Sequence, residues 1–135
     1  MNSLQIAEQF VVAINAHNIE GIVALMTRDH RFTDSLGNVV EGRESMRGGW
    51  AAYFEMVPDY NLTIEKRFVA AENTEEVVLV GMAYGSYANE GHIQAGSAWS
   101  TPIAVRAAVR HARISEWRVY ADNQPIREQI RATSA

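Results

Sequence analysis

The residues best suited to acid–base chemistry lie on one short predicted strand. His30, Phe32 and Asp34 alternate with Arg31 and Thr33, and this two-residue period is typical of a strand. The alternation places His30 and Asp34 on the same face. A carboxyl at the end of a strand, with apolar neighbours, can lie in a pocket where desolvation raises its pKa toward the range of a useful general base. Asp34 is therefore the first catalytic candidate, and His30 is a second acid–base group or hydrogen-bond donor.

Both residues also have a structural interpretation. Asp34 precedes Ser35-Leu36-Gly37-Asn38, a segment with the composition of a turn, so its carboxyl can instead cap the backbone of that turn. His30 can be a partly exposed residue where a helix meets the strand, and the sequence favours this second interpretation of His30. The two interpretations of Asp34 carry equal weight.

Composition narrows the classes of function. The chain has 135 residues, 12 basic and 16 acidic side chains, a formal charge of −4, 47% apolar residues and no cysteine. Disulfide frameworks, thiolate metal sites and cysteine nucleophiles are excluded, and the four histidines have no metal-ligand spacing, so we expect neither a metal nor a cofactor. The scattered arginines argue against nucleic acid as a partner. With no membrane-length apolar run and no signal peptide, we expect a single cytoplasmic domain over residues 1–135, without a membrane partner.

The order of elements predicts an α+β fold, with helices on one face of a curved antiparallel sheet. Apolar residues at helical spacing and turn residues between them predict helices over 3–17, 19–27, 43–56 and 125–132, and extended segments over 30–34, 39–40, 60–70, 75–88, 97–111 and 113–122. Asn2 with Gln5, and Asn18, are expected to cap the first two helices. Trp50 and Phe54 lie one helical turn apart and are expected to face the sheet, leaving an apolar pocket between the first and third helices.

Several segments together resemble a known family. They are AINAHN, IVALMTRDH, FTDSLG, VEGRESMR, VPDYNLTIE and ISEWRVYADNQPI. In this order they resemble the superfamily of SnoaL-like polyketide cyclases and ketosteroid isomerases, which shares a cone-shaped α+β fold with nuclear transport factor 2. The resemblance covers essentially the whole chain. It is specific for the fold and weak for the reaction, because this fold hosts enzymes, ligand binders and interaction domains.

The resemblance gives three positions an expected role. Asp34 lies where the isomerases carry their catalytic aspartate. Phe10 lies where they carry a tyrosine that binds the enolate oxygen, and Val105 or a close neighbour lies where they carry a protonated aspartic acid. Neither Phe10 nor Val105 can donate a hydrogen bond, which argues against steroid isomerisation by the family's mechanism.

Another group would have to stabilise an oxyanion in such a reaction. His30, Tyr53, Tyr84 or an ordered water are the candidates. The expected ligand-binding residues are mostly aromatic and line the interior of the cone: Phe10, Phe32, Trp50, Tyr53, Phe54, Tyr84, Val105 and Trp117.

Three functions fit these observations. The first is an isomerase-, cyclase- or lyase-type enzyme that acts on a small apolar cyclic or carbonyl-containing ligand with Asp34 as base. The second is a binding protein for an apolar metabolite, and the third is a dimeric interaction domain. Apolar residues on both faces of 97–111 and 113–122 also predict a homodimer through the outer face of the sheet.

Overall fold

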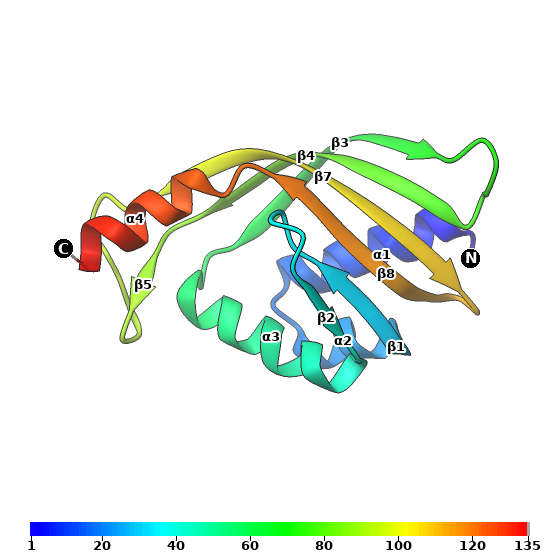
Figure 1. Cartoon of the computed structure of the whole chain (residues 1–135), viewed down its shortest axis with the longest axis horizontal. Coiled ribbons are helices and arrows are strands. Elements are labelled where there is room, and N and C mark those ends of the chain that lie inside the picture. The colour runs from blue at the N-terminus through cyan, green and yellow to red at the C-terminus, as the bar shows by residue number, and fades with distance from the viewer. Residues whose placement is uncertain (135) are drawn as a thin grey trace.

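The computed structural model describes residues 1–134 and has the expected α+β architecture (Figure 1). In chain order the elements are α1 (Ser3–Asn15), α2 (Ile19–Ala24), β1 (Met26–Thr33), β2 (Val39–Glu41), α3 (Arg43–Met56), β3 (Asn61–Val69), β4 (Glu76–Gly85), β5 (Ala88–Asn89), β6 (His92–Ile93), β7 (Trp99–Arg110), β8 (Arg113–Ala121) and α4 (Gln124–Ser134). Among the described residues, no helix is long and apolar enough to cross a membrane.

Local signals set the starts of the first two helices. Asn2 and Gln5 form the predicted capping box, in which each side chain bonds the other residue's backbone N–H. Asn18 accepts from the N–H of Gly21 and caps α2. The predicted end of the first helix was two residues late, because His17 has a φ of 52° and cannot continue a right-handed helix.

The second helix is shorter than predicted, and the strand after it is longer. The carbonyl of Leu25 accepts from the N–H of Ile114, and Met26 is already paired with Ile114 in the sheet. Residues 25–27 are therefore not part of the helix, because strand pairing competes for their backbone groups. This pairing is tertiary, so no local pattern could indicate it.

The six main strands form one curled, open sheet in the order β2-β1-β8-β7-β4-β3. The sheet is mostly antiparallel, as predicted; only β1 and β8 pair in parallel, a pairing that the sequence did not indicate. Most of the chain separates β1 from β8, so no hairpin forces them to be antiparallel. The predicted strand over 75–88 stops at Gly85: the N–H of Ser86 donates to the carboxylate of Asp59 at 2.7 Å, and residues 88–93 form a separate small hairpin.

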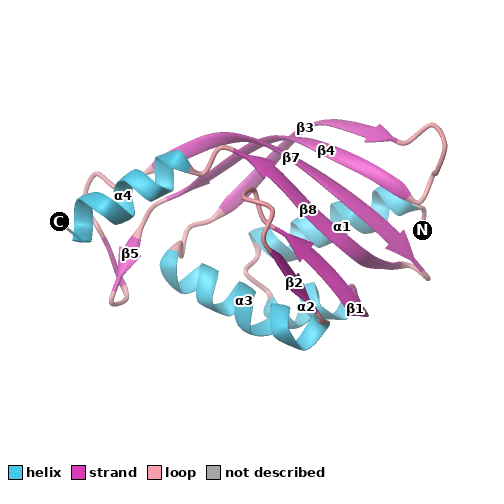
Figure 2. Cartoon of the chain, in the orientation of Figure 1, coloured by secondary structure: helices cyan, strands magenta, loops and turns pink. Residues whose placement is uncertain are grey.

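Helices α1 and α3 lie on the inner face of the sheet, as Figure 2 shows. Helix α1 packs against β3, β4, β7 and β8, whereas α3 packs mainly against α2 and β1. Trp50 and Phe54 are 6% and 9% exposed, which confirms that this stripe of α3 faces inward. The ring of Phe10 from α1 lies 4.7 Å from that of Trp117, so the two helices and the sheet share one core.

Candidate functional site

A cavity of about 390 Å³ lies between α3, α4 and the inner face of the sheet. Its size is near the lower end of small-molecule sites, and its lining is mostly apolar. From β1, the turn after it, β2 and α3 the lining residues are Phe32, Asp34, Ser35, Val40, Met46, Gly49, Trp50, Tyr53 and Met56. From the segment before β3 onward they are Tyr60, Leu62, Ala83, Trp99, Thr101, Ile103, Trp117, Val119, Ala121, Asp122, Asn123, Ile126, Arg127 and Ile130.

The sequence predicted a cavity between the first and third helices, and this prediction was wrong. No residue of α1 reaches its lining, because the side chains of α1 fill their half of the concave face completely. Of the predicted ligand contacts, Phe32, Trp50, Tyr53 and Trp117 line the cavity. The other four are elsewhere: Phe10 and Val105 are fully buried in the core, Phe54 stacks on His17, and Tyr84 is 38% exposed.

Asp34 lines the cavity and also organises the turn after β1. Its Oδ1 accepts from the backbone N–H groups of Leu36 and Asn38, both at 2.9 Å, and its Oδ2 accepts from Nδ2 of Asn38 at 3.1 Å. These contacts are the ones expected if Asp34 caps the turn. Its nearest polar neighbours are N–H donors, whereas the sequence led us to expect mostly apolar surroundings.

His30 is not part of the cavity. It is fully buried beside Phe10, and its Nδ1–H donates to the carbonyl of Ile114 at 2.8 Å. Its Nε2 then carries the lone pair and has no partner among the described residues. Burial lowers the pKa of His30 below its ordinary value, although the bond to Ile114 opposes this shift. Both interpretations from sequence, a pocket residue and a partly exposed one, are therefore corrected to a neutral core histidine.

Four aromatic side chains with hydrogen-bonding atoms follow one another along the cavity wall. The ring centroids of Trp50 and Tyr53 are 6.5 Å apart, those of Tyr53 and Tyr60 are 4.9 Å apart, and those of Tyr60 and Trp99 are 6.3 Å apart. Burial raises the pKa of both tyrosines, and for Tyr60 the neighbouring Tyr53 adds to the increase. Both phenols therefore stay neutral and keep their protons.

Sequence reasoning missed several lining residues, among them Tyr60, Trp99 and those of helix α4. Ile126 and Ile130 lie one turn apart and face the cavity, and Arg127 lines it between them. The same i, i+4 spacing is visible in the sequence, but nothing there shows what the stripe would cover. Asp122 accepts from the N–H of Gln124 and so begins the helix.

The sequence profile of the SnoaL-like domain matches residues 7–117 of this chain. The chain belongs to the SnoaL-like domain family. The match begins in α1 and ends partway along β8, so the lining residues from Val119 onward, including those of α4, lie outside it.

Solved structures with the same fold are similar to this SnoaL-like domain. A protein from Catenulispora acidiphila with a ketosteroid isomerase-like fold, in complex with trimethylamine, is 21% identical, with a TM-score of 0.78 and coverage of 93% of this chain and 91% of the other. A proposed polyketide cyclase from Xanthomonas campestris is 17% identical, with a TM-score of 0.82 and coverage of 95% and 96%. At these identities the likeness shows the fold alone. No curated protein matches the chain.

Phe10 and Val105, which the resemblance aligned with the two oxyanion donors of the isomerases, lie in the core. Phe10 and Val105 are apolar, are 0% and 1% exposed, and do not line the cavity. Any hydrogen-bond donor for a ligand oxygen in the cavity must therefore come from other residues. Among the described residues, no three metal-ligating side chains lie together.

Proposed function

We propose that this SnoaL-like domain binds a small, largely apolar cyclic ligand with a carbonyl group, and that Asp34 removes a proton next to that carbonyl. The observation that supports this most directly is a carboxylate on the lining of an otherwise apolar, aromatic cavity. The reaction would be of the isomerase, cyclase or lyase type, as in other uses of this fold.

The contacts of Asp34 are compatible with the role of a base. Three N–H groups hold the carboxylate, two on Oδ1 and one on Oδ2. A carboxylate oxygen can accept two hydrogen bonds, so Oδ2 retains one free position. The turn thus fixes the orientation of the group and leaves one oxygen able to take a proton.

The proposed chemistry can be tested with a simple ketone. We suggest 2-tetralone, an aromatic ring fused to a cyclic ketone, dissolved in D2O. The base takes a carbon-bound proton beside the carbonyl, the enolate forms, and a deuteron from the exchanged carboxyl returns to the carbon. NMR follows the loss of the proton signal. We expect Asp34→Asn to slow the protein-dependent exchange about 100-fold or more.

Asp29→Asn is the matched control, because Asp29 is a carboxylate on β1, the strand just before Asp34, and is ion-paired to Arg110 outside the cavity. Quenching of tryptophan fluorescence should show that both variants still bind 2-tetralone. Equal exchange rates in the wild type and Asp34→Asn would remove Asp34 as the base. Binding without any exchange in the wild type would instead support the second candidate, a binding protein, which the missing family oxyanion donors favour.

A further inference from the structure

The cavity contains two tyrosine hydroxyls whose hydrogen bonds are not made by the protein. Tyr53 comes from α3 and Tyr60 from the segment before β3, and both rings line the cavity. Neither hydroxyl bonds to another described residue, and neither belongs to the fully enclosed unpaired polar atoms, which include Nε1 of Trp50 and of Trp99. Both hydroxyls therefore lack a hydrogen-bond partner among the described residues.

The two tyrosine rings are neighbours on the cavity wall. The two rings meet edge to face with their centroids 4.9 Å apart, and Tyr60 is only 8% exposed. A hydroxyl removed from water without a partner is unfavourable, so a ligand oxygen that accepts its hydrogen bond gains affinity. The backbone carbonyl of Tyr60 is held by His17 at 2.7 Å, which fixes the position of this segment.

The charges around the cavity argue for a neutral acceptor. The charged side chains of its lining are two carboxylates, Asp34 and Asp122, and one guanidinium, Arg127. Arg127 is exposed on α4, whereas the hydroxyls lie among aromatic and aliphatic side chains. A carboxylate ligand would be desolvated against a lining with an excess of negative charge, whereas a ketone or quinone oxygen would not carry that penalty.

From this geometry we propose that Tyr53 and Tyr60 form a two-hydroxyl site for the carbonyl oxygen of a neutral cyclic ketone or quinone. The inference rests on the proposed function and defines its substrate class. It also assigns the oxyanion donors that Phe10 and Val105 cannot supply: as Asp34 removes the proton, the negative charge developing on the ketone oxygen would lie against the two phenols.

Three compounds of similar shape test the proposal through quenching of tryptophan fluorescence. They are 2-tetralone, tetralin, which is the same skeleton without oxygen, and 2-naphthoate, which is an anion. The wild type should bind 2-tetralone more tightly than tetralin. Tyr53→Phe and Tyr60→Phe should each weaken 2-tetralone binding about two- to tenfold, the range of one neutral hydrogen bond, and leave tetralin binding unchanged.

Tyr84→Phe is the matched control, because Tyr84 does not line the cavity, and it should change neither affinity. Tetralin serves as the internal check that a variant keeps its fold. Equal affinity of the wild type for tetralin and 2-tetralone, or retention of the preference in the Tyr53→Phe Tyr60→Phe double variant, would overturn this inference alone. Tighter binding of 2-naphthoate would overturn the neutral class and point to Arg127. If neither 2-tetralone nor tetralin binds, both the proposed function and this inference fail.

Discussion

At the scale of a single residue, the contacts that Asp34 makes in its turn and its proposed role as a base can be separated by substitution. As the acceptor of three hydrogen bonds it stabilises the turn between β1 and β2, and as a proposed base it needs its charge. Asparagine keeps an oxygen for the two backbone N–H groups and loses the charge, whereas alanine loses both. Asp34→Ala therefore measures the contribution of the side chain to the stability of the turn, and Asp34→Asn measures the contribution of its charge to proton transfer.

We expect Asp34→Ala to lower the free energy of unfolding by about 1–2 kcal/mol, since the turn loses the three hydrogen bonds that the carboxylate accepts. Asp34→Asn should cost less than about 1 kcal/mol. Urea unfolding at neutral pH measures both values. Ser35→Ala in the same turn is the control, with an expected change within about 0.5 kcal/mol. Equal stability of the alanine variant and the wild type would show that the turn does not need this carboxylate.

His30 should make stability depend on pH. Its pKa is lowered in the folded protein and ordinary in the unfolded chain, so the unfolded state binds more protons between the two values. Stability should thus be complete above about pH 6.5 and fall as the pH decreases below it, by at most about 1.4 kcal/mol per pH unit. Melting temperatures from pH 7.5 to 5 should show this decrease in the wild type and a smaller one in His30→Phe. His92→Gln, at an exposed histidine, should show the same pH dependence as the wild type. If the His30→Phe curve runs parallel to that of the wild type, the pH dependence does not come from His30.

At the scale of elements, two glycines are predicted to respond in opposite directions. A Cβ on Gly85 at the end of β4 would lie 2.3 Å from Cγ1 of Val57 and 3.0 Å from the ring of Trp99. A Cβ on Gly48 within α3 would meet no atom within 4 Å. Gly85→Ala should lower the free energy of unfolding by about 1–3 kcal/mol, whereas Gly48→Ala should raise it by about 0.5–1 kcal/mol. Chemical denaturation measures both free energies of unfolding. If Gly85→Ala were stabilising, the side chains of Val57 and Trp99 would have to move to accommodate the new methyl group.

Features that depend on a single helix or strand were predicted well from the sequence. The capping box at Asn2 and the inward stripe of Trp50 and Phe54 need only helical geometry, and both are confirmed. Strand β4 was ambiguous because both of its faces are apolar. Val77, Leu79 and Ala83 point inward in the structure, so Tyr84 points outward. The residues that alternate with them, Val78, Val80 and Met82, are also apolar, so the sequence allowed the opposite assignment equally well.

Features that depend on several elements could not be predicted from the sequence. The cavity lies where α3 and α4 cover the sheet, and its wall includes Tyr60 from the segment before β3 and Trp99 from β7. The catalytic role of Asp34 stays a prediction, because its position was indicated by the family resemblance and its contacts serve the turn as well. The family match shows the fold and leaves the reaction to experiment.

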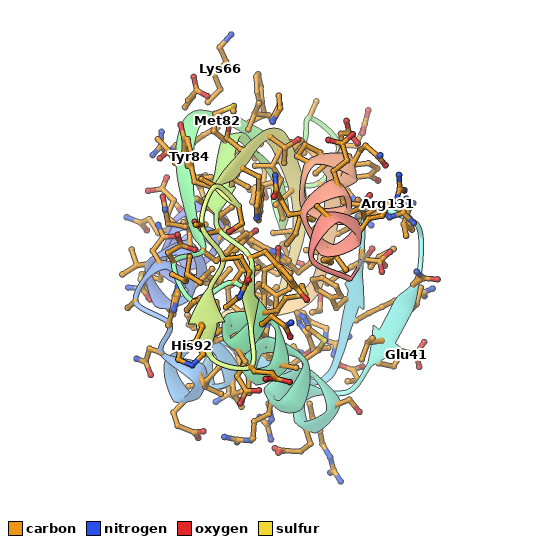
Figure 3. The ribbon with its side chains drawn as sticks, turned by 90° about the vertical axis from the view of Figure 1, so that its left-hand side faces the viewer. Glu41, Lys66, Met82, Tyr84, His92 and Arg131 are labelled. Carbon is orange, nitrogen blue, oxygen red and sulfur yellow. The ribbon has the colours of Figure 1, made fainter. Side chains whose placement is uncertain are left out.

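At the scale of the whole molecule, the outer face of the sheet is the predicted interface between two copies. Val80 pairs with Ala104 and Met82 with Pro102, which places apolar side chains side by side on β4 and β7. Figure 3 shows Met82 on the side of the sheet away from α3. Beside them, Arg106 is paired with Glu76 and Glu116, so its charge is neutralised within the face.

We expect a homodimer that buries roughly 1,200–2,000 Å² through this face. Val80→Glu should dissociate it, because the new carboxylate would be desolvated against its symmetry-related copy. Sedimentation velocity at micromolar concentration measures the mass. Val12→Glu is the control, since Val12 is 68% exposed on α1. A wild-type monomer at that concentration would contradict the dimer and with it the interaction-domain alternative.

The parallel pairing of β1 with β8 has a consequence for how the chain folds. The buried histidine of β1 is bonded to a carbonyl 84 residues further along, and β1 has only the three-residue β2 as its other neighbour. The first third of the polypeptide therefore cannot complete its part of the sheet until β8 has been synthesised. Loop closure over that distance is slow, since its entropic cost precedes the contacts that compensate for it. On the ribosome, β1 and the turn that holds Asp34 would be among the last parts to become protected from solvent, although they are among the first to be made.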